Sequence, residues 1–149
     1  MIAIALYKGK PQDDIWHIIS HYLICLRTLS KYSHAELVID DMCYSSSARD
    51  GGVRSKQIDL TSGKWDVIEI SIPVEQEIDA IEWFGINYGK NYDWSNILRY
   101  LIPFIGHKNN QYICFEAVGE ALGFAGAYKL NANDLKEWAL AHEKLKLIN

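Results

Sequence analysis

The stretch "AELVIDDMCYSSS", residues 35–47, decides the fold class. "AELVI" and "MCYSSS" each have the length of a short strand, and Asp40 and Asp41 stand between them as a two-residue turn. Two strands joined by so short a polar turn pair as a β-hairpin. The stretch therefore predicts two neighbouring antiparallel strands.

Two more segments predict strands of the same sheet. "IAIALY", residues 2–7, is a short apolar run that ends in the turn-forming residues "KGKPQDD", which indicates a buried strand. "WDVIEISIP", residues 65–73, alternates apolar and polar side chains and ends at Pro73. Together with the hairpin they predict a small antiparallel sheet.

Apolar residues recur at helical spacing in most of the remaining chain. Polar residues that favour helix caps precede two of these segments. The predicted helices are residues 15–29 with Asp13 or Asp14 as the cap, 75–88, 95–106 with an interruption at Pro103, a short helix that begins near Cys114 and stops at Gly123, and 135–146 with Asn133 or Asp134 as the cap.

The whole chain reads as one unit. Its 149 residues contain no internal repeat, no low-complexity tract and no linker, and a chain of this length is typical of one domain. Strands and helices of these lengths predict an α+β fold in which helices pack on the small antiparallel sheet. We therefore expect a single domain over residues 1–149.

Composition and charge exclude several classes of protein. The chain is 49% hydrophobic and 23% charged, with a net charge of −4. This is an ordinary soluble composition, and it offers neither the basic footprint of a nucleic-acid binder nor a basic stripe for an anionic membrane surface. No stretch is long and apolar enough to span a bilayer, so no transmembrane segment is expected.

The cysteines and the N-terminus indicate where the protein is expected to act. The chain has 3 cysteines and no CxxC pair, which is unlike a secreted disulfide scaffold and favours a reducing compartment. "MIAIALYKGK" lacks the positive start and the length of a signal peptide. We therefore expect a cytoplasmic protein.

Cys114 is the first candidate for chemistry. It stands in "QYICFEAVGEALGF", residues 111–124, where a strand-like pattern changes to a helical one. At the start of a helix the dipole favours an anion, so a thiol there has a lowered pKa. Buried cysteines more often serve as small hydrophobic residues, and this stretch alone favours that alternative.

His34 is the candidate base. It begins the strand in "KYSHAELVI" and shares one strand face with Glu36 and Val38. A histidine held at the start of a core strand is well positioned to move a proton, although a lone histidine more often serves only as a structural group. Zinc sites built from His17 with His21, or from Cys43 with His34, lack further ligands, so neither a metal nor a cofactor is expected.

Taken together, these motifs resemble a known family. "YSHAELVID" and "CYSSSARDGGVRSKQIDL", followed by "YICFEAVGEALG", are similar to the circularly permuted papain-like hydrolases, the NlpC-type and YiiX-like enzymes with their lecithin:retinol acyltransferase-like branch. The order fits the permuted branch, because the histidine strand precedes the cysteine helix. The match runs from about residue 2 to residue 124 and is closest to short phage and prophage members.

The resemblance implies a role for each matched residue. Cys114 becomes the nucleophile and His34 its base and later acid. Ser46, twelve positions after His34, takes the place of the third polar residue that orients the imidazole, where the family has a residue such as histidine or glutamate; Glu36, Asp50 or a backbone carbonyl are alternatives. Phe115 replaces the serine of the family's "CSE". The residues expected to border the substrate are Tyr7, Tyr112 and Glu36.

Three functions follow as expectations. The first is a cysteine peptidase or amidase that cleaves an amide bond, with peptidoglycan peptide as a candidate substrate. The second keeps the same pair for a lipid ester or acyl chain. The third is a non-catalytic structural or tail-assembly component of a phage, in which case the protein would be released or virion-associated. The sequence leaves the oligomeric state open.

Overall fold

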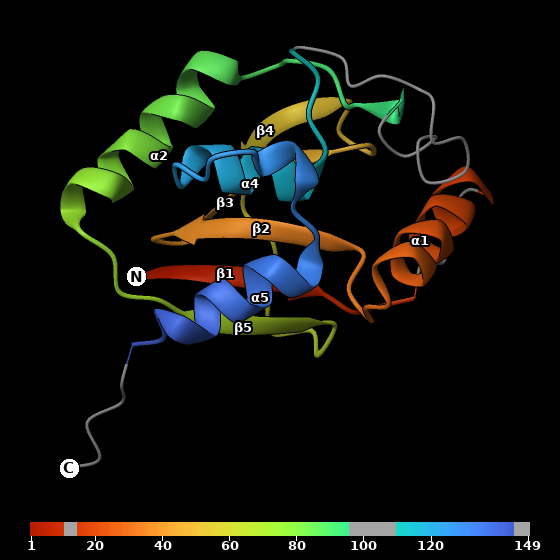
Figure 1. Cartoon of the computed structure of the whole chain (residues 1–149), viewed down its shortest axis with the longest axis horizontal. Coiled ribbons are helices and arrows are strands. Elements are labelled where there is room, and N and C mark those ends of the chain that lie inside the picture. The colour runs from red at the N-terminus through yellow and green to blue at the C-terminus, as the bar shows by residue number, and fades with distance from the viewer. Residues whose placement is uncertain (11–14, 96–109, 145–149) are drawn as a thin grey trace.

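The computed structural model describes residues 1–10, 15–95 and 110–144 and confirms the α+β fold class. Five strands form one antiparallel sheet, and the described helices pack around it (Figure 1). The elements are β1 (Ile2–Tyr7), α1 (Ile15–Thr28), β2 (His34–Ile39), β3 (Met42–Ser47), β4 (Gly52–Lys56), β5 (Trp65–Glu69), α2 (Val74–Asn87), α4 (Cys114–Ala121), the 3-10 helix η1 (Ala127–Lys129) and α5 (Ala132–Ala141).

The strand order is β4-β3-β2-β1-β5, with every pair antiparallel. The predicted hairpin is confirmed: Ile39 pairs with Met42, which leaves Asp40 and Asp41 as the two-residue turn. Asp40 adopts a positive φ of 41°, a conformation that aspartate tolerates better than most residues. β1 lies between β2 and β5 and is buried along most of its length, as its apolar sequence predicts.

One face of the sheet carries the main hydrophobic core. α4 packs over β2 and β3, and α5 packs over β1 and β5 (Figure 1). The side chains of β2 that point to this side are Ala35, Leu37 and Ile39, as strand alternation predicts. Phe115 of α4 is fully buried in the same core. The packing therefore fixes the helix that begins at Cys114 directly against the strand that begins at His34.

The opposite face is lined by smaller residues. Ala3, Ala5, Val38 and Cys43 form a second buried cluster. Ile58 and Leu60, from the segment that joins β4 to β5, pack against it together with Trp65 at the start of β5. Because the residues of this cluster are small, polar side chains such as His34 and Glu36 can lie on the same face, near the end of the sheet where β2 begins.

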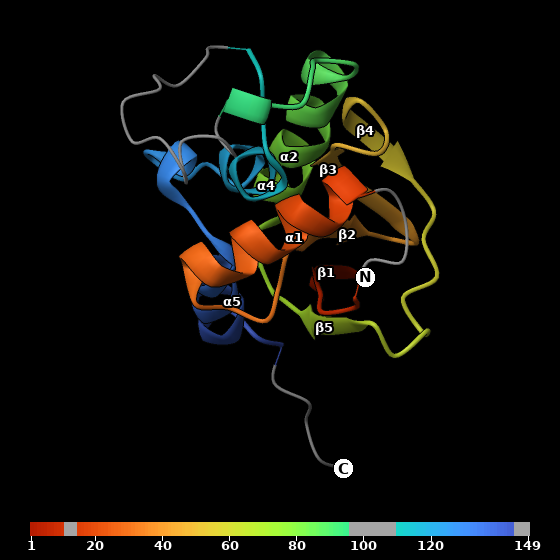
Figure 2. The ribbon, with the colours of Figure 1, turned by 90° about the vertical axis from the view of Figure 1, so that its right-hand side faces the viewer.

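Helix α1 lies across that same end of the sheet, as the two perpendicular views show (Figures 1 and 2). The helix is present as predicted, but its expected apolar face is only partly buried. Ile24 is 5% exposed, whereas Ile15 and Leu26 are 63% and 73% exposed. Among the described residues, no helix is both long and apolar enough to cross a bilayer.

The other predicted helices agree with the structure to different degrees. α2 begins and ends within one residue of the prediction. α4 stops before Gly123, whose φ of +80° marks the predicted end. α5 begins earlier than predicted, because Asn131 is its cap and Asp134 completes a capping box. The cap at Asp13 or Asp14 and most of the helix predicted over residues 95–106 lie outside the described residues.

Gly52 lets a later segment pack against the edge of the sheet. Its φ is +154°, and a Cβ built on it would lie 1.9 Å from the carbonyl oxygen of Lys90. The contact is held by backbone hydrogen bonds, with the N–H of Val53 donating to Lys90 at 2.9 Å and that of Tyr92 donating to Gly51 at 3.1 Å. Only glycine permits this approach at this dihedral angle.

We predict that Gly52→Ala and Gly85→Ala change stability in opposite directions. At Gly52 the left-handed backbone alone costs about 1–3 kcal/mol, and the clash with Lys90 adds to it. Gly85 lies within α2 with nothing within 4 Å of a built Cβ, so alanine should stabilise by about 0.5–1 kcal/mol. Urea unfolding of both variants checks this. Equal stability of Gly52→Ala and the parent would contradict the role given to the close approach.

Candidate active site

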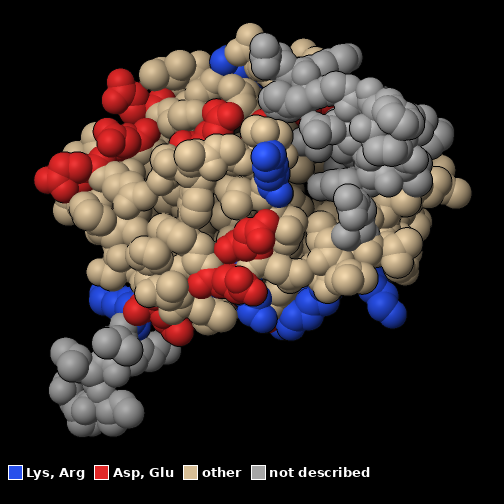
Figure 3. All heavy atoms as spheres, in the orientation of Figure 1, with Lys and Arg blue, Asp and Glu red and all other residues tan. Residues whose placement is uncertain are grey.

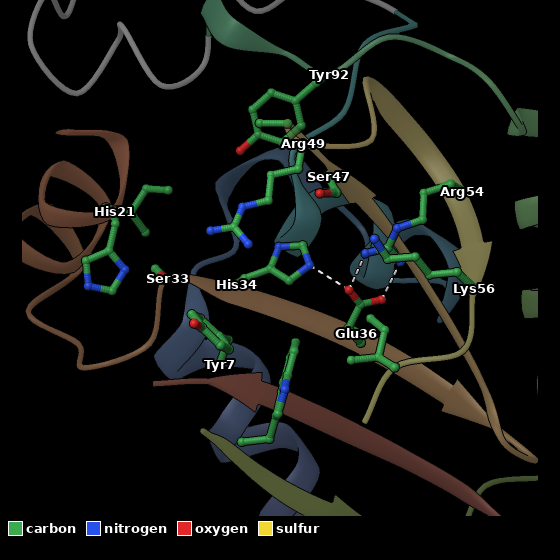
Figure 4. Close-up of a pocket in the computed structure, with 14 residues that line it drawn as sticks. Tyr7, His21, Ser33, His34, Glu36, Ser47, Arg49, Arg54, Lys56 and Tyr92 are labelled. Carbon is green, nitrogen blue, oxygen red and sulfur yellow. Dashed lines mark hydrogen bonds and ion pairs between the residues drawn. The ribbon is translucent and has the colours of Figure 1, made fainter. Parts of the chain in front are cut away.

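A row of side chains crosses the sheet at the end where β2 begins. The register pairs Trp65 of β5 with Tyr7 of β1, and Tyr7 with His34 of β2. Continuing the β2–β3 register from Leu37 and Tyr44 places Ser47 opposite His34. All four line one pocket (Figure 4). We call Trp65, Tyr7, His34 and Ser47 the pocket row.

The next row of the same face holds a buried carboxylate. Two residues along β2, Glu36 pairs with Ala5 on one side and, by the same register, with Ser45 on the other. Ser45 pairs in turn with Arg54 of β4. Because Ser45 is small, the long side chain of Arg54 reaches over it to Glu36. The strand register thus brings together two charged residues separated by one strand.

Glu36 and Arg54 form a two-point ion pair. Arg54 donates from Nη1 to Oε2 at 2.6 Å and from Nη2 to Oε1 at 2.5 Å. Glu36 is 0% exposed. Burial by itself raises the pKa of Glu36, but the hydrogen bonds from Arg54 and the charge of His34 outweigh it and lower that pKa below its ordinary value. The carboxylate is therefore held ionised inside the protein.

Asp50 and Lys56 extend the ion pair toward the surface. Arg54 Nε donates to Asp50 at 2.8 Å, and Lys56 Nζ donates to the same carboxylate at 2.6 Å. Burial would raise the pKa of Asp50, but these hydrogen bonds lower it to about 2. The pKa of Arg54 is raised by its two carboxylate partners against the effect of its burial. Asp50 thus holds Arg54 in the position from which it binds Glu36.

His34 lies at the other side of Glu36. Its Nε2 is 2.7 Å from Glu36 Oε1, and its side chain is 21% exposed (Figure 4). Burial lowers the pKa of His34, but Cys114 and Glu36, each by charge and by hydrogen bond, raise it to about 9. The imidazole is consequently protonated at neutral pH. Glu36 also fixes the ring, because it occupies one of its two nitrogens.

Cys114 is the first residue of α4. Ile113 precedes it in an extended conformation, with φ −88° and ψ 167°, and no side chain caps the helix. The first N–H groups of the helix therefore have no capping side chain as an acceptor. Cys114 is 1% exposed. It lies close enough to His34 to raise the pKa of the imidazole, so the helix start and the strand start meet.

The pocket beside this pair is small, and its lining mixes polar with apolar side chains. Its volume is about 240 Å³, and it lies between the pocket row, α1 and the turn after β3. Polar and charged side chains make up much of its wall (Figure 4). Cys114 is not among the described residues that line the pocket, so the sulfur lies beneath its wall next to His34. The lining polar residues include His21, Ser33, His34, Glu36, Ser47, Arg49, Arg54 and Lys56.

Ser46 does not orient the imidazole as the family pattern led us to expect. Side chains alternate along β3, so Ser46 points to the face opposite Ser45 and Ser47. Its hydroxyl donates to the carbonyl of Tyr112 at 2.6 Å. Glu36, one of the alternatives, is the residue that bonds to His34. Ser46 instead anchors the backbone two residues before Cys114.

The three residues expected at the substrate have different surroundings. Tyr7 lines the pocket, with its ring centroid 5.0 Å from that of Trp65. Tyr112 is 8% exposed and packs on Trp83 in the core, and burial raises the pKa of its phenol. Glu36 lines the base of the pocket, but both of its oxygens are bonded to Arg54 and His34. Neither Tyr112 nor Glu36 is therefore placed to bind substrate.

The remaining cysteines differ from Cys114 in their surroundings. Cys43 is buried in the second cluster, and burial with the nearby charge of Glu36 raises its pKa to about 11. Cys25 lies 3.9 Å from His21 Nε2 on α1, and burial raises the pKa of its thiol. No group of three or more histidine, cysteine, aspartate or glutamate side chains among the described residues is arranged to hold a metal ion.

Sequence reasoning missed Arg54 and the part that Asp50 plays beside it. Both lie in "ARDGGVR", residues 48–54, a stretch with two consecutive glycines. A signal was present. Glu36 falls on the same strand face as His34, and an acidic residue in a strand with a buried neighbour requires a cationic partner. The strand after the hairpin is the nearest source of one, which points to Arg54.

No protein-family model matches the chain, and no curated protein matches it. The geometry of Cys114, His34 and Glu36 is therefore the basis for a functional proposal.

We predict that Glu36→Gln and Ser46→Ala separate the two candidate partners of His34. Removing the charge of Glu36 leaves Arg54 with Asp50 as its one remaining carboxylate partner and its buried Nη donors without a carboxylate, which costs about 1–3 kcal/mol. The same change lowers the pKa of His34 from about 9 toward its ordinary value. Ser46→Ala removes one hydrogen bond, about 1 kcal/mol, because the Tyr112 carbonyl still accepts from the N–H of Asp93. Urea unfolding and NMR titration of His34 measure both effects.

The assignment of Glu36 fails if Ser46→Ala lowers the pKa of His34 as much as Glu36→Gln does. Glu36→Asp serves if the glutamine variant unfolds, because it keeps the charge that Arg54 needs but shortens the reach to His34. In that variant the pKa of His34 should fall while most of the stability is retained.

The stability of the protein should also depend on pH through His34. Its folded-state pKa, about 9, exceeds the unfolded value of about 6.5. The stability that the protonated ring adds is therefore fully present below about pH 6.5 and is lost as pH rises through about 9. The free energy of unfolding, measured from pH 6 to 9.5 for the parent and for His34→Gln, should show a difference that shrinks over this range. A constant difference would contradict the raised pKa.

Proposed function

We propose that the chain is a cysteine hydrolase that cleaves an amide bond. The observation that carries the proposal is an imidazole held between a helix-start cysteine and a buried, ionised carboxylate. Cys114 is the nucleophile, His34 is the base and acid, and Glu36 orients the ring. In this arrangement the base activates a weak nucleophile by taking its proton, and a third group holds the base in position.

The reaction would proceed in two steps. The Cys114 sulfur, having given its proton to His34, attacks the carbonyl carbon of the amide. The C–N bond then breaks, the leaving amine takes the proton from His34, and a thioester remains on Cys114. Water, losing a proton to His34, attacks the thioester, and the acid leaves as the sulfur regains the proton.

The start of α4 would stabilise the charge that develops on the substrate oxygen. Backbone N–H groups in the first turn of a helix lack partners within the helix, and α4 has no side-chain cap. Donors aimed at a developing oxyanion are worth several kcal/mol of barrier. Because Cys114 begins the helix, a carbonyl attacked by its sulfur lies next to these donors.

The arrangement also supports membership in the circularly permuted papain-like group. In this chain the strand with the histidine precedes the helix with the cysteine, and the helix packs on that strand and its hairpin partner. This is the order that the sequence resemblance implies. On this proposal, peptidoglycan peptide is the candidate amide substrate.

Two observations favour an amide over the rival functions. The pocket of about 240 Å³ is smaller than a typical small-molecule site, which suits a short peptide segment better than a long acyl chain. The non-catalytic alternative was motivated by a serine as the third residue, and that place is taken by Glu36. Both observations support a catalytic site for a compact substrate.

We predict that iodoacetamide near neutral pH modifies Cys114 faster than Cys25 or Cys43. Burial raises the pKa values of Cys25 and Cys43, which keeps those thiols protonated and slow to react. Cys114 is 1% exposed, so exposure alone would make it one of the slower cysteines. Peptide mapping by mass spectrometry gives the three rates. The proposal is wrong if Cys114 reacts no faster than the other two.

His34→Gln is the control for the alkylation. It removes the base while leaving Cys114 in place, so the preference for Cys114 should disappear. If the preference persists in this variant, the reactivity arises from the helix start alone and His34 is not the base.

A further inference from the structure

Helix α2 presents large apolar side chains to solvent. The exposed fractions lie between 41% and 71% for Val74, Ile78, Ile81, Ile86 and Tyr88. The helix packs on the rest of the protein through a different face, made by Ala80, Phe84 and Asn87. The exposed apolar residues are therefore not part of the core that α2 helps to form.

Most of these residues follow the spacing of a coiled-coil seam. The positions separated by alternating steps of four and three residues are Val74, Ile78, Ile81, Gly85 and Tyr88. Residues with this spacing form one stripe along a helix, into which the side chains of a second helix pack. A Cβ built on Gly85 has nothing within 4 Å, so this point of the stripe is open to a partner. We call these five residues the α2 seam.

The α2 seam is unfavourable for the isolated helix. Valine, isoleucine and glycine form helices less readily than alanine, leucine or lysine. A surface helix ordinarily has polar or charged residues on the side away from the core, and an apolar side chain left in water gains nothing from burial. The residues of the seam are therefore explained better by a contact with another molecule than by the fold of this chain.

Acidic side chains flank the α2 seam. When the seam residues are taken as the a and d positions of a heptad, Glu75 and Glu82 fall at e positions and Glu77 at a g position. Charges at e and g determine which helix can pair with the seam. Asp79 is a further acidic residue of α2, and the helix contains no lysine or arginine. Figure 3 shows acidic side chains gathered over this part of the molecule.

These carboxylates keep their negative charge unbalanced. Among the described residues, no lysine or arginine forms an ion pair with any of them. Glu77 acts on one cation, the Met1 amino group, whose pKa is raised mainly by the hydrogen bond and the charge of Asp40 and less by Glu77. Asp40 already binds that amino group at 2.8 Å. A negative excess therefore remains along the α2 seam.

We propose that the α2 seam binds a basic amphipathic helix of another protein. The apolar face of the partner packs into the seam, and its lysine or arginine side chains pair with Glu75, Glu77 and Glu82. No α2 residue is among the described residues that line the pocket beside His34. The proposal is thus independent of the hydrolase proposal and adds a protein-binding surface to the chain.

A second copy of this chain fits the seam less well. Two α2 helices would place glutamates against glutamates at the flanking positions, which disfavours their pairing. Helix α1 also exposes apolar residues, but it contains one arginine and no lysine. The charges that flank the seam therefore favour a partner richer in lysine and arginine.

Two synthetic peptides of about three heptads test the seam. Both have leucine at the a and d positions; one has lysine at e and g, and the other has glutamate there. Like charges keep each peptide from pairing with itself. In fluorescence anisotropy titrations with the full chain, the basic peptide should bind and the acidic peptide should not. A higher salt concentration should weaken the binding, because salt screens exposed charges.

Ile78→Gln should lower the affinity for the basic peptide by roughly tenfold, the loss expected when one large apolar side chain is no longer buried on binding. Leu140→Gln is the matched control, because Leu140 is an exposed apolar residue of another helix, α5. The affinity should be unchanged in this variant. Both positions are exposed in the folded chain, so neither substitution removes a core contact.

A charge reversal tests the flanking glutamates. Glu82→Lys should weaken binding of the basic peptide and strengthen binding of the acidic peptide. Glu137→Lys, at an exposed position of α5, changes the net charge by the same amount and should leave both affinities as they are in the parent chain.

Several results would overturn the proposal. One is that the basic peptide does not bind; another is that Ile78→Gln and Leu140→Gln weaken it equally. An equal loss in Glu82→Lys and Glu137→Lys also overturns it, because net charge then explains the binding. Sedimentation without peptide tests the second copy as the occupant. If the parent chain forms a dimer and Ile78→Gln is a monomer, a second copy occupies the seam and the proposed partner is wrong.

Discussion

The ion pair between Glu36 and Arg54 is the constraint on which the site depends. A carboxylate with 0% exposure is tolerated only when its charge is matched and its oxygens are hydrogen-bonded. Arg54 provides both through two bonds, and Asp50 holds Arg54 from the other side. A pair of this kind adds little net stability compared with apolar residues of similar size. Its presence in a small sheet is therefore better explained by what it does to His34.

The ion pair fixes the protonation and the orientation of one imidazole. Glu36 stays ionised because Arg54 is always charged, so it can stabilise a positive ring at 2.7 Å. The interaction with Cys114 raises the pKa of His34 further, so that it reaches about 9 despite burial. A neutral residue in place of Glu36 could orient the ring but would not stabilise its charge. The carboxylate thus makes His34 able both to accept and to hold a proton.

The helices and strands around the site could be predicted from the sequence, but not all of the contacts between their side chains. Hydrophobic alternation and the Asp40–Asp41 turn predicted the hairpin, and helical spacing predicted α4 with Cys114 at its start. The family pattern predicted that Ser46, twelve residues after His34, orients the imidazole. Because side chains alternate along β3, Ser46 instead points to the other face of the sheet. The position of Arg54 depends on the register of a third strand, which follows a glycine turn with unusual dihedral angles. Local patterns do not encode that register.

The proposed pair also shows why the end of the sheet, and not its centre, is the place for this chemistry. His34 belongs to the face with the pocket row, whereas α4 and Cys114 pack on the opposite face. In the middle of a strand the backbone would separate two such groups. At the first residue of β2 the sheet ends, so the imidazole can reach the cysteine around the strand while Glu36, two residues along, is fully buried. The same geometry gives the ring one side toward a buried carboxylate and one toward the pocket, which is what a group that shuttles a proton between nucleophile and substrate requires.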